Sequence, residues 1–194
     1  MSFCIELDKL GFNIKNIDLG GGIGINYDTD EQDQKFLIEY TNLIKSTFKN
    51  INKKIILEPG RFLVANAGIL VASVLYKKTI DSKNFLIIDA GMNDLMRPAL
   101  YGATHKILPS IKKSKNSKKI HEFVGPICES TDKFCTLNKF QKIKEKDLVV
   151  ICDVGAYGMT LSSNYNLRTK PIELLISGAK IKVIKKRQKY NELI

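Results

Sequence analysis

The feature that most constrains the fold is an apolar strand that runs directly into a run of glycines. Residues 16–19 have strand character. The glycines that follow at once are Gly20, Gly21 and Gly22. Hydrophobic side chains then recur at helical spacing over residues 36–48, and residues 54–57 form a second buried strand. A strand, a glycine turn, a helix and another strand are typical of a βα unit in an α/β fold.

The pattern changes after about residue 68. From there the sequence consists of short runs of Val, Ile and Leu separated by Gly, Pro and Asn, without a long amphipathic helix. Such a pattern favours an antiparallel β domain. We therefore predict an α/β part over residues 1–67, whose helix Thr29 or Asp30 would cap, and an all-β domain over residues 68–194.

Composition and charge argue against several classes of function. The net charge is +11, but six lysines lie among Ser, Asn and Pro within residues 106–119 and indicate a solvated loop. Four cysteines at irregular spacings and two histidines do not form a metal-ligand pattern. The longest apolar stretch, residues 62–76, is interrupted, and the first residues lack the basic flank and apolar block that are typical of a signal peptide. We expect a cytoplasmic protein that binds no nucleic acid, membrane or metal ion.

Polar side chains follow the two predicted strands at their carboxyl ends. The second strand runs into Glu58, Pro59, Gly60 and Arg61. In parallel α/β folds the active site lies at these ends of the strands. Glycines let backbone N–H groups approach a phosphate, although a glycine run is also compatible with a tight turn alone. A buried Glu58 would need a cationic partner, so Glu58 and Arg61 are compatible with a structural ion pair or with a ligand-binding pair.

Three later turns also carry polar or reactive side chains. The turn within residues 89–102 concentrates Asp89, Asn93, Asp94, Arg97 and Tyr101. An arginine in such a loop can bind a carboxylate through two hydrogen bonds. Cys128 lies beside Glu129 after another turn, and Tyr157 follows a further buried strand. Taken singly, Cys128 is equally compatible with a packed side chain and Tyr157 with a corner residue.

Together, and in this order, the motifs resemble those of the diaminopimelate decarboxylases. They are Leu-Gly-Gly-Gly-Ile-Gly-Ile, Glu-Pro-Gly-Arg, Asp-Ala-Gly-Met-Asn-Asp-x-x-Arg-Pro-Ala-Leu-Tyr-Gly, Gly-Pro-Ile-Cys-Glu-Ser and Gly-Ala-Tyr-Gly-Met-x-x-x-Ser-Asn-Tyr-Asn. The resemblance extends from about Asp18 to the end of the chain. The last three motifs separate this family from related decarboxylases of the alanine-racemase fold.

The resemblance implies the C-terminal part of a (β/α)₈ barrel that binds pyridoxal 5'-phosphate, followed by an antiparallel β domain. It also implies a homodimer with shared active sites. Members of the family remove one carboxylate from meso-2,6-diaminopimelate to give L-lysine and CO₂, a step of lysine biosynthesis. The expected cofactor is therefore pyridoxal phosphate, and the expected partners are this small-molecule substrate and a second subunit.

The resemblance assigns the first two motifs to the cofactor. Backbone amides of Gly20, Gly21 and Gly22 would hold its phosphate. Within the motif Glu58-Pro59-Gly60-Arg61, the glutamate would accept a hydrogen bond from the pyridine nitrogen. Arg61 would lie near both the phosphate and the substrate.

The later motifs are assigned by the resemblance to the substrate. Arg97 and Tyr101 would hold a substrate carboxylate, and Tyr157 would contact cofactor and substrate together. Cys128 and Glu129 would reach into the site of the neighbouring subunit. There Cys128 would donate a proton, and Glu129 would read the amino end of the substrate.

The chain departs from the family in length, because members are much longer. The first part of their barrel supplies a lysine that binds the cofactor covalently, and no lysine here lies in a matching motif. We therefore interpret the chain as N-terminally truncated and expect it to be inactive alone. One alternative is an ornithine- or arginine-type decarboxylase of the same fold, against which Arg97, Tyr101 and Glu129 argue. Another is a non-catalytic remnant that binds a full-length partner.

Overall fold

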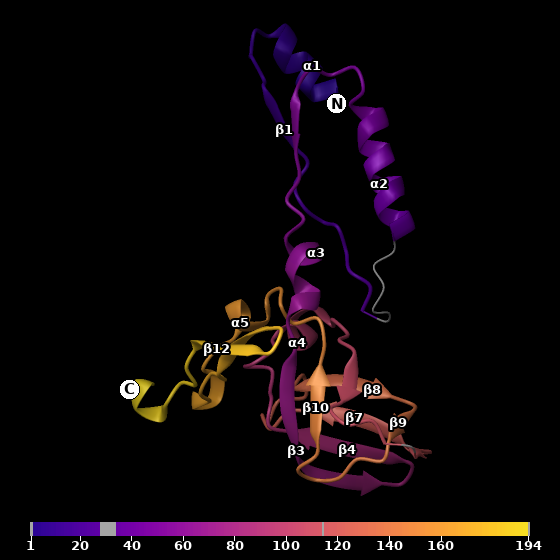
Figure 1. The fold of residues 1–194 in the computed structure, drawn as a ribbon, viewed down its shortest axis with the longest axis vertical. Helices are drawn as coiled ribbons and strands as arrows, with labels where there is room; N and C mark the ends of the chain where they lie inside the picture. The colour runs from indigo at the N-terminus through magenta and orange to yellow at the C-terminus, as the bar shows by residue number, and fades with distance from the viewer. Residues whose placement is uncertain (1, 28–33, 114, 194) are drawn as a thin grey trace. The chain divides into compact units, whose positions relative to one another are not determined.

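The chain divides into two compact units, Met1–Leu63 and Val64–Ile194. The computed structural model describes residues 2–27, 34–113 and 115–193 (Figure 1). The proposed helix caps, Thr29 and Asp30, lie outside the described residues. The two units divide within helix α3 (Gly60–Val64), a short distance before the boundary expected from the sequence.

The first unit contains two short parallel strands. β1 (Asn16–Asp18) and β2 (Lys54–Ile56) pair in parallel, with Ile17 opposite Ile55. Helix α2 (Gln34–Thr47) lies between them in the chain, and α1 (Ser2–Lys9) precedes them. Parallel neighbours require a crossover of this kind, because the chain must return to the same end before the second strand starts. The predicted order of strand, glycine turn, helix and strand is confirmed.

The second unit is organised by a six-stranded sheet with the order β5-β10-β3-β4-β7-β8. Strands β3, β4, β7, β8 and β10 of this sheet are labelled in Figure 1. Its strands are β3 (Leu70–Ile80), β4 (Lys83–Ile88), β5 (Ile107–Pro109), β7 (Ile120–Val124), β8 (Lys133–Leu137) and β10 (Leu148–Ile151). All neighbouring pairs are antiparallel except β4 and β7, which run in parallel with Leu86 opposite Phe123. The sheet is therefore mixed rather than wholly antiparallel, because the chain crosses over between β4 and β7 instead of returning in a hairpin.

Short elements surround this sheet. They are η1 (Ala65–Ala67), α4 (Arg97–Tyr101), α5 (Gly158–Leu161), η2 (Tyr165–Leu167), η3 (Tyr190–Glu192), the antiparallel pair of β6 (Asn116–Ser117) with β9 (Phe140–Gln141), and the hairpin of β11 (Glu173–Ser177) with β12 (Lys180–Lys185). The lysine-rich segment that was expected to be a loop carries β5 and β6 at its two ends. Within the described residues, no helix has the length and apolar character needed to cross a bilayer.

The core of the second unit lies on one face of the sheet. Side chains of β4 are alternately buried and half-buried, as expected for a strand with one face against a core. Phe123 is fully buried, and its ring meets the edge of Phe140 with the centroids 5.1 Å apart. The core also encloses a polar pair, in which Asn84 Nδ2 lies 3.2 Å from His121 Nε2. This packed sheet supports the loops that carry the candidate residues of the second unit.

Candidate functional site

In the first unit, the segments that leave β1 and β2 stay side by side beyond the strands. The Leu19 N–H donates to Ile56 O at 3.0 Å, and the Glu58 N–H donates to Gly20 O at 2.8 Å. Asp18 accepts a further bond from the Gly20 N–H at 2.8 Å. The glycine turn and the Glu58 backbone therefore lie next to each other at the carboxyl ends of two parallel strands, as the sequence predicted.

The backbone of this turn requires glycine. Gly20 and Gly22 have φ angles of +69° and +93°, which L-residues with a side chain rarely adopt. A Cβ atom on Gly21 would lie 2.5 Å from the carbonyl oxygen of Glu58, so a side chain there would separate the two segments. Successive backbone N–H groups in such a left-handed turn form a concavity suited to an anion.

The side chains of the second motif are accessible. Glu58 is exposed, Pro59 is half-buried, and Gly60 starts α3. Arg61 is half-buried in the first turn of that helix. Among the ion pairs of the described residues, none joins Glu58 to Arg61. Of the two alternatives that the sequence left open, the structural ion pair is not seen among the described residues, and both side chains are accessible to a ligand.

In the second unit, the residues of the 89–102 motif are divided between interior and surface. Arg97 is 5% exposed, and its Nη1 lies 3.3 Å from His105 Nε2. The other ring nitrogen of His105 lies 2.9 Å from the carbonyl oxygen of Cys152. Burial, together with the charge of Arg97, lowers the pKa of His105, so the imidazole is neutral and accepts from the guanidinium. Tyr101, at the other end of α4, is 67% exposed.

Cys128 and Glu129 are both exposed and lie against a later segment of the same unit. The Tyr165 hydroxyl donates a hydrogen bond to the Glu129 carboxylate. The amide nitrogen of Asn166 lies 4.0 Å from Cys128 Sγ. The structure thus brings the thiol–carboxylate pair together with residues of the Ser-Asn-Tyr-Asn motif.

Tyr157 is exposed just before helix α5, with a left-handed φ of +64°. Two residues before it, Gly155 makes an unusually close backbone approach: a Cβ there would lie 2.0 Å from Val64 O. The Gly155 N–H also donates to Ala65 O at 2.9 Å. The position of Tyr157 therefore depends on a contact that only glycine permits.

Sequence reasoning missed Asp132 and Arg168, which tie three loops together. The buried Asp132 carboxylate accepts from the backbone N–H groups of Met92 and Ile127, both at 2.7 Å. Arg168 donates to Asn93 Oδ1 at 2.9 Å and to the carbonyl oxygen of Asp89 at 2.5 Å. Burial raises the pKa of Asp132. The one feature of the sequence that could have identified these two residues is that each closely follows a motif.

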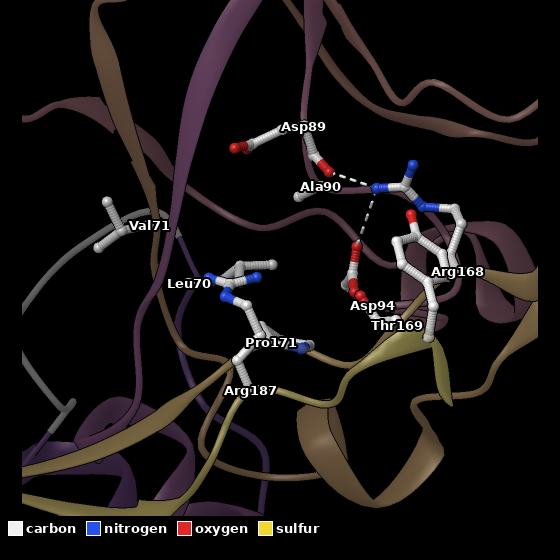
Figure 2. A pocket seen from close by; sticks show the side chains of 10 residues that line it. Leu70, Val71, Asp89, Ala90, Asp94, Arg168, Thr169, Pro171 and Arg187 are labelled. Carbon is white, nitrogen blue, oxygen red and sulfur yellow. Dashed lines mark hydrogen bonds and ion pairs between the residues drawn. The ribbon is translucent and has the colours of Figure 1, made fainter. Parts of the chain in front are cut away.

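A cavity of about 220 Å³ lies beside this network. Figure 2 shows the guanidinium of Arg168 next to Asp94 and to the backbone of Asp89, with Arg187 on the lining as well. Carboxylates and guanidinium groups therefore both line the cavity. Cys128, Glu129 and Tyr157 are not among its lining residues. Elsewhere in the described residues, no three His, Cys, Asp or Glu side chains are grouped so as to hold a metal ion.

Replacing Asp132 is expected to loosen the loops that carry the candidate site. Asp132→Ala leaves two backbone N–H groups without their acceptor, which should cost about 2–4 kcal/mol of unfolding free energy. Asp132→Asn retains one acceptor oxygen and should cost less. Chemical denaturation of the two variants and the parent measures the difference. Equal stability of Asp132→Ala and the parent would contradict the bridging role.

Comparison with known proteins places these features in a family. The family described as pyridoxal-dependent decarboxylase, C-terminal sheet domain, matches residues 12–155. The chain therefore belongs to the pyridoxal-dependent decarboxylases.

Several relatives are similar over nearly the whole chain. The diaminopimelate decarboxylase of Haemophilus influenzae is 43% identical, over 97% of this chain and 45% of the relative. That of Aquifex aeolicus is 38% identical, over 97% of this chain and 44% of the relative. The chain spans about half the length of the curated relatives it matches.

Two solved structures are also similar. The diaminopimelate decarboxylase of Helicobacter pylori, complexed with L-lysine, matches with a TM-score of 0.88 and 38% identity, over 99% of this chain and 47% of that one. The diaminopimelate decarboxylase of Methanocaldococcus jannaschii matches with a TM-score of 0.89 and 38% identity, over 100% and 45%.

Proposed function

We propose that this chain forms the C-terminal half of a diaminopimelate decarboxylase, which converts meso-2,6-diaminopimelate to L-lysine and CO₂. The observation that carries the proposal is the glycine turn held beside Glu58 at the ends of two parallel strands. The 38–43% identity to diaminopimelate decarboxylases over 97% of the chain supports it. The complete enzyme would combine this chain with the half that precedes the matched region in the relatives.

The residues of the first unit fit pyridoxal phosphate. The left-handed backbone at Gly20 and Gly22 suits a phosphate, and the absence of a side chain on Gly21 lets this turn lie against the Glu58 backbone. The exposed Glu58 carboxylate suits a protonated pyridine nitrogen, and Arg61 is accessible for phosphate or substrate. When bound, the cofactor supplies an electron sink for the bond that loses CO₂.

The residues of the second unit fit a substrate with an amino-acid group at each end. Arg97 and Tyr101 would hold a carboxylate. Glu129 would bind the distal ammonium group, and Cys128 beside it would donate the proton that replaces CO₂. Tyr157 would contact cofactor and substrate.

The first unit would complete a (β/α)₈ barrel with the missing half, and the second would be the C-terminal β domain of a homodimer. The apolar side chains of α2 support the barrel proposal, since Phe36, Ile38 and Leu43 are 44%, 60% and 64% exposed. Glu58 and Cys128 lie in separate compact units, which is compatible with sites shared between subunits. Cytoplasmic localisation and the lack of nucleic-acid binding stay predictions.

Turnover by the complete enzyme tests the proposed function. With pyridoxal phosphate, it should form L-lysine from meso-2,6-diaminopimelate, followed by mass spectrometry, and should prefer this substrate to ornithine and arginine by at least about a hundredfold in kcat/KM. Preference for ornithine or arginine would instead support a decarboxylase of that type. Binding without turnover of any of the three would support a non-catalytic partner module.

The 194-residue chain alone should not bind the cofactor covalently, because no lysine lies in a matching motif. After incubation with pyridoxal phosphate and reduction with borohydride, peptide mass spectrometry should find only scattered labelling of surface lysines. Stoichiometric labelling of one lysine would contradict this expectation, since this chain would then carry the covalent site itself.

A further inference from the structure

Glu129 has a hydrogen-bond donor that the proposed function does not use. The Tyr165 hydroxyl reaches the Glu129 carboxylate from a segment 36 residues further along the chain. A carboxylate on a short exposed loop has several rotamers of similar energy, and a fixed donor on one oxygen selects among them. The second oxygen remains available to a ligand.

The segment that carries Tyr165 has a strained backbone. Asn166 has φ 52° and ψ 31°, and Leu167 has φ 55°. Asn tolerates the left-handed region, whereas an L-residue such as Leu is disfavoured there by roughly 1–2 kcal/mol. Two consecutive residues of this kind persist only where the surrounding contacts determine the conformation.

Both ends of this strained turn are anchored. Before it, the Ser163 N–H donates to Asn93 O at 2.9 Å. After it, the Arg168 guanidinium donates to the Asn93 side chain at 2.9 Å and to Asp89 O at 2.5 Å. Asn93 itself is fully buried. The anchors leave Tyr165 and Asn166 at the tip of the turn, where they meet Glu129 and Cys128.

We propose that Tyr165 is a positioning residue for Glu129, fixed in place by the left-handed turn at Asn166 and Leu167. It orients the carboxylate toward the distal ammonium group of the substrate and thereby sets substrate affinity. This inference rests on the proposed function, in which Glu129 binds that group. Glu129 raises the pKa of Tyr165, which keeps the phenol protonated and able to donate.

Steady-state kinetics of the complete enzyme tests the proposal. Tyr165→Phe removes only the hydroxyl and should raise KM for meso-2,6-diaminopimelate roughly tenfold. Since the distal group lies away from the reacting carbon, kcat should change less than about twofold. Tyr76→Phe, at an exposed tyrosine on β3, is the matched control and should leave both constants unchanged. An unchanged KM in Tyr165→Phe would overturn the proposal.

A double-mutant cycle separates positioning from a general structural effect. In a Glu129→Gln background, Tyr165→Phe should have little further effect on kcat/KM, because the carboxylate that it orients is gone. If the losses in kcat/KM caused by the two substitutions are additive, the proposal is overturned, even if each substitution alone weakens the enzyme. Affinity for the product L-lysine, which retains the distal group, should follow the same pattern in calorimetry.

A titration provides a readout that does not require turnover. Tyrosine ionisation is followed by absorbance near 295 nm, with Tyr165→Phe identifying the contribution of Tyr165. In Glu129→Gln this contribution should move to lower pH, because the carboxylate that raises the pKa of Tyr165 has been removed. An unmoved titration would show that the contact does not form. If the parent enzyme shows no turnover but the titration of Tyr165 still moves in Glu129→Gln, the proposed function is contradicted and the contact between Tyr165 and Glu129 is not.

Discussion

Complete enzymes carrying Cys128→Ala and Glu58→Ala, each nearly inactive alone, are expected to regain activity when their subunits are mixed. In the proposed homodimer each site combines Glu58 of one subunit with Cys128 of the partner subunit. A mixed dimer then holds one site with both defects and one with neither. Random exchange at equal concentration makes about half of the dimers mixed, so up to about a quarter of all sites are intact.

The expected change is large because each parent variant lacks a group at the reacting centre. Loss of the carboxylate at the pyridine nitrogen or of the proton donor should each reduce kcat by about a hundredfold or more. The measurement is L-lysine formation after subunits have been exchanged in mild denaturant. A Cys128→Ala sample mixed with Tyr76→Phe is the control for activity lost during the exchange procedure. Only one of its two variants is defective, so about half of its sites are intact whether or not subunits exchange.

Mixed dimers that remain inactive would contradict the shared site. If mass spectrometry of differently tagged subunits shows mixed dimers, and these remain as inactive as the parents, then Cys128 and Glu58 serve the same subunit. The homodimer with shared sites would then be wrong, whereas the assignment of both residues to the reaction would stand. A loss of dimers altogether in either variant would appear in the same experiment as a monomer mass.

The part of the site that could be predicted consists of motifs that directly follow a strand in the sequence. A strand followed by glycines, and a second strand followed by Glu58, place both motifs at one edge of a parallel pair, because parallel strands end on the same side. The hydrogen bond from Glu58 to Gly20 confirms that placement. The change of pattern after residue 68 likewise indicated a β-rich second part, which the six-stranded sheet confirms.

The parts that could not be predicted depend on contacts between distant residues. Arg168 reaches Asp89 across 79 positions, and Tyr165 reaches Glu129 across 36. Nothing near Arg97 indicates that His105 covers it, and no periodicity shows that β4 and β7 run in parallel. Such contacts follow from the tertiary fold, and hydrophobic pattern records only which face of an element is buried.

The largest effect on stability is expected from Gly155→Ala. The added Cβ would lie 2.0 Å from Val64 O and 2.9 Å from the backbone nitrogen of Gly68, so backbone rather than a flexible side chain must move. The movement would also break the bond from the Gly155 N–H to Ala65 O and the bond from the Val154 N–H to Gly68 O. Overpacking and two lost hydrogen bonds together should cost about 3–5 kcal/mol.

The same substitution should reduce turnover, because Tyr157 lies two residues further along and its left-handed φ of +64° depends on the position of this segment. Gly24→Ala is the matched control: no atom lies within 4 Å of the added Cβ, so its unfolding midpoint should stay close to that of the parent. Denaturant unfolding of the complete enzyme, followed by circular dichroism, compares the two. If Gly155→Ala unfolds at the same midpoint as Gly24→Ala, the backbones of residues 64–68 and 155 can separate without cost, and glycine is not required before Tyr157.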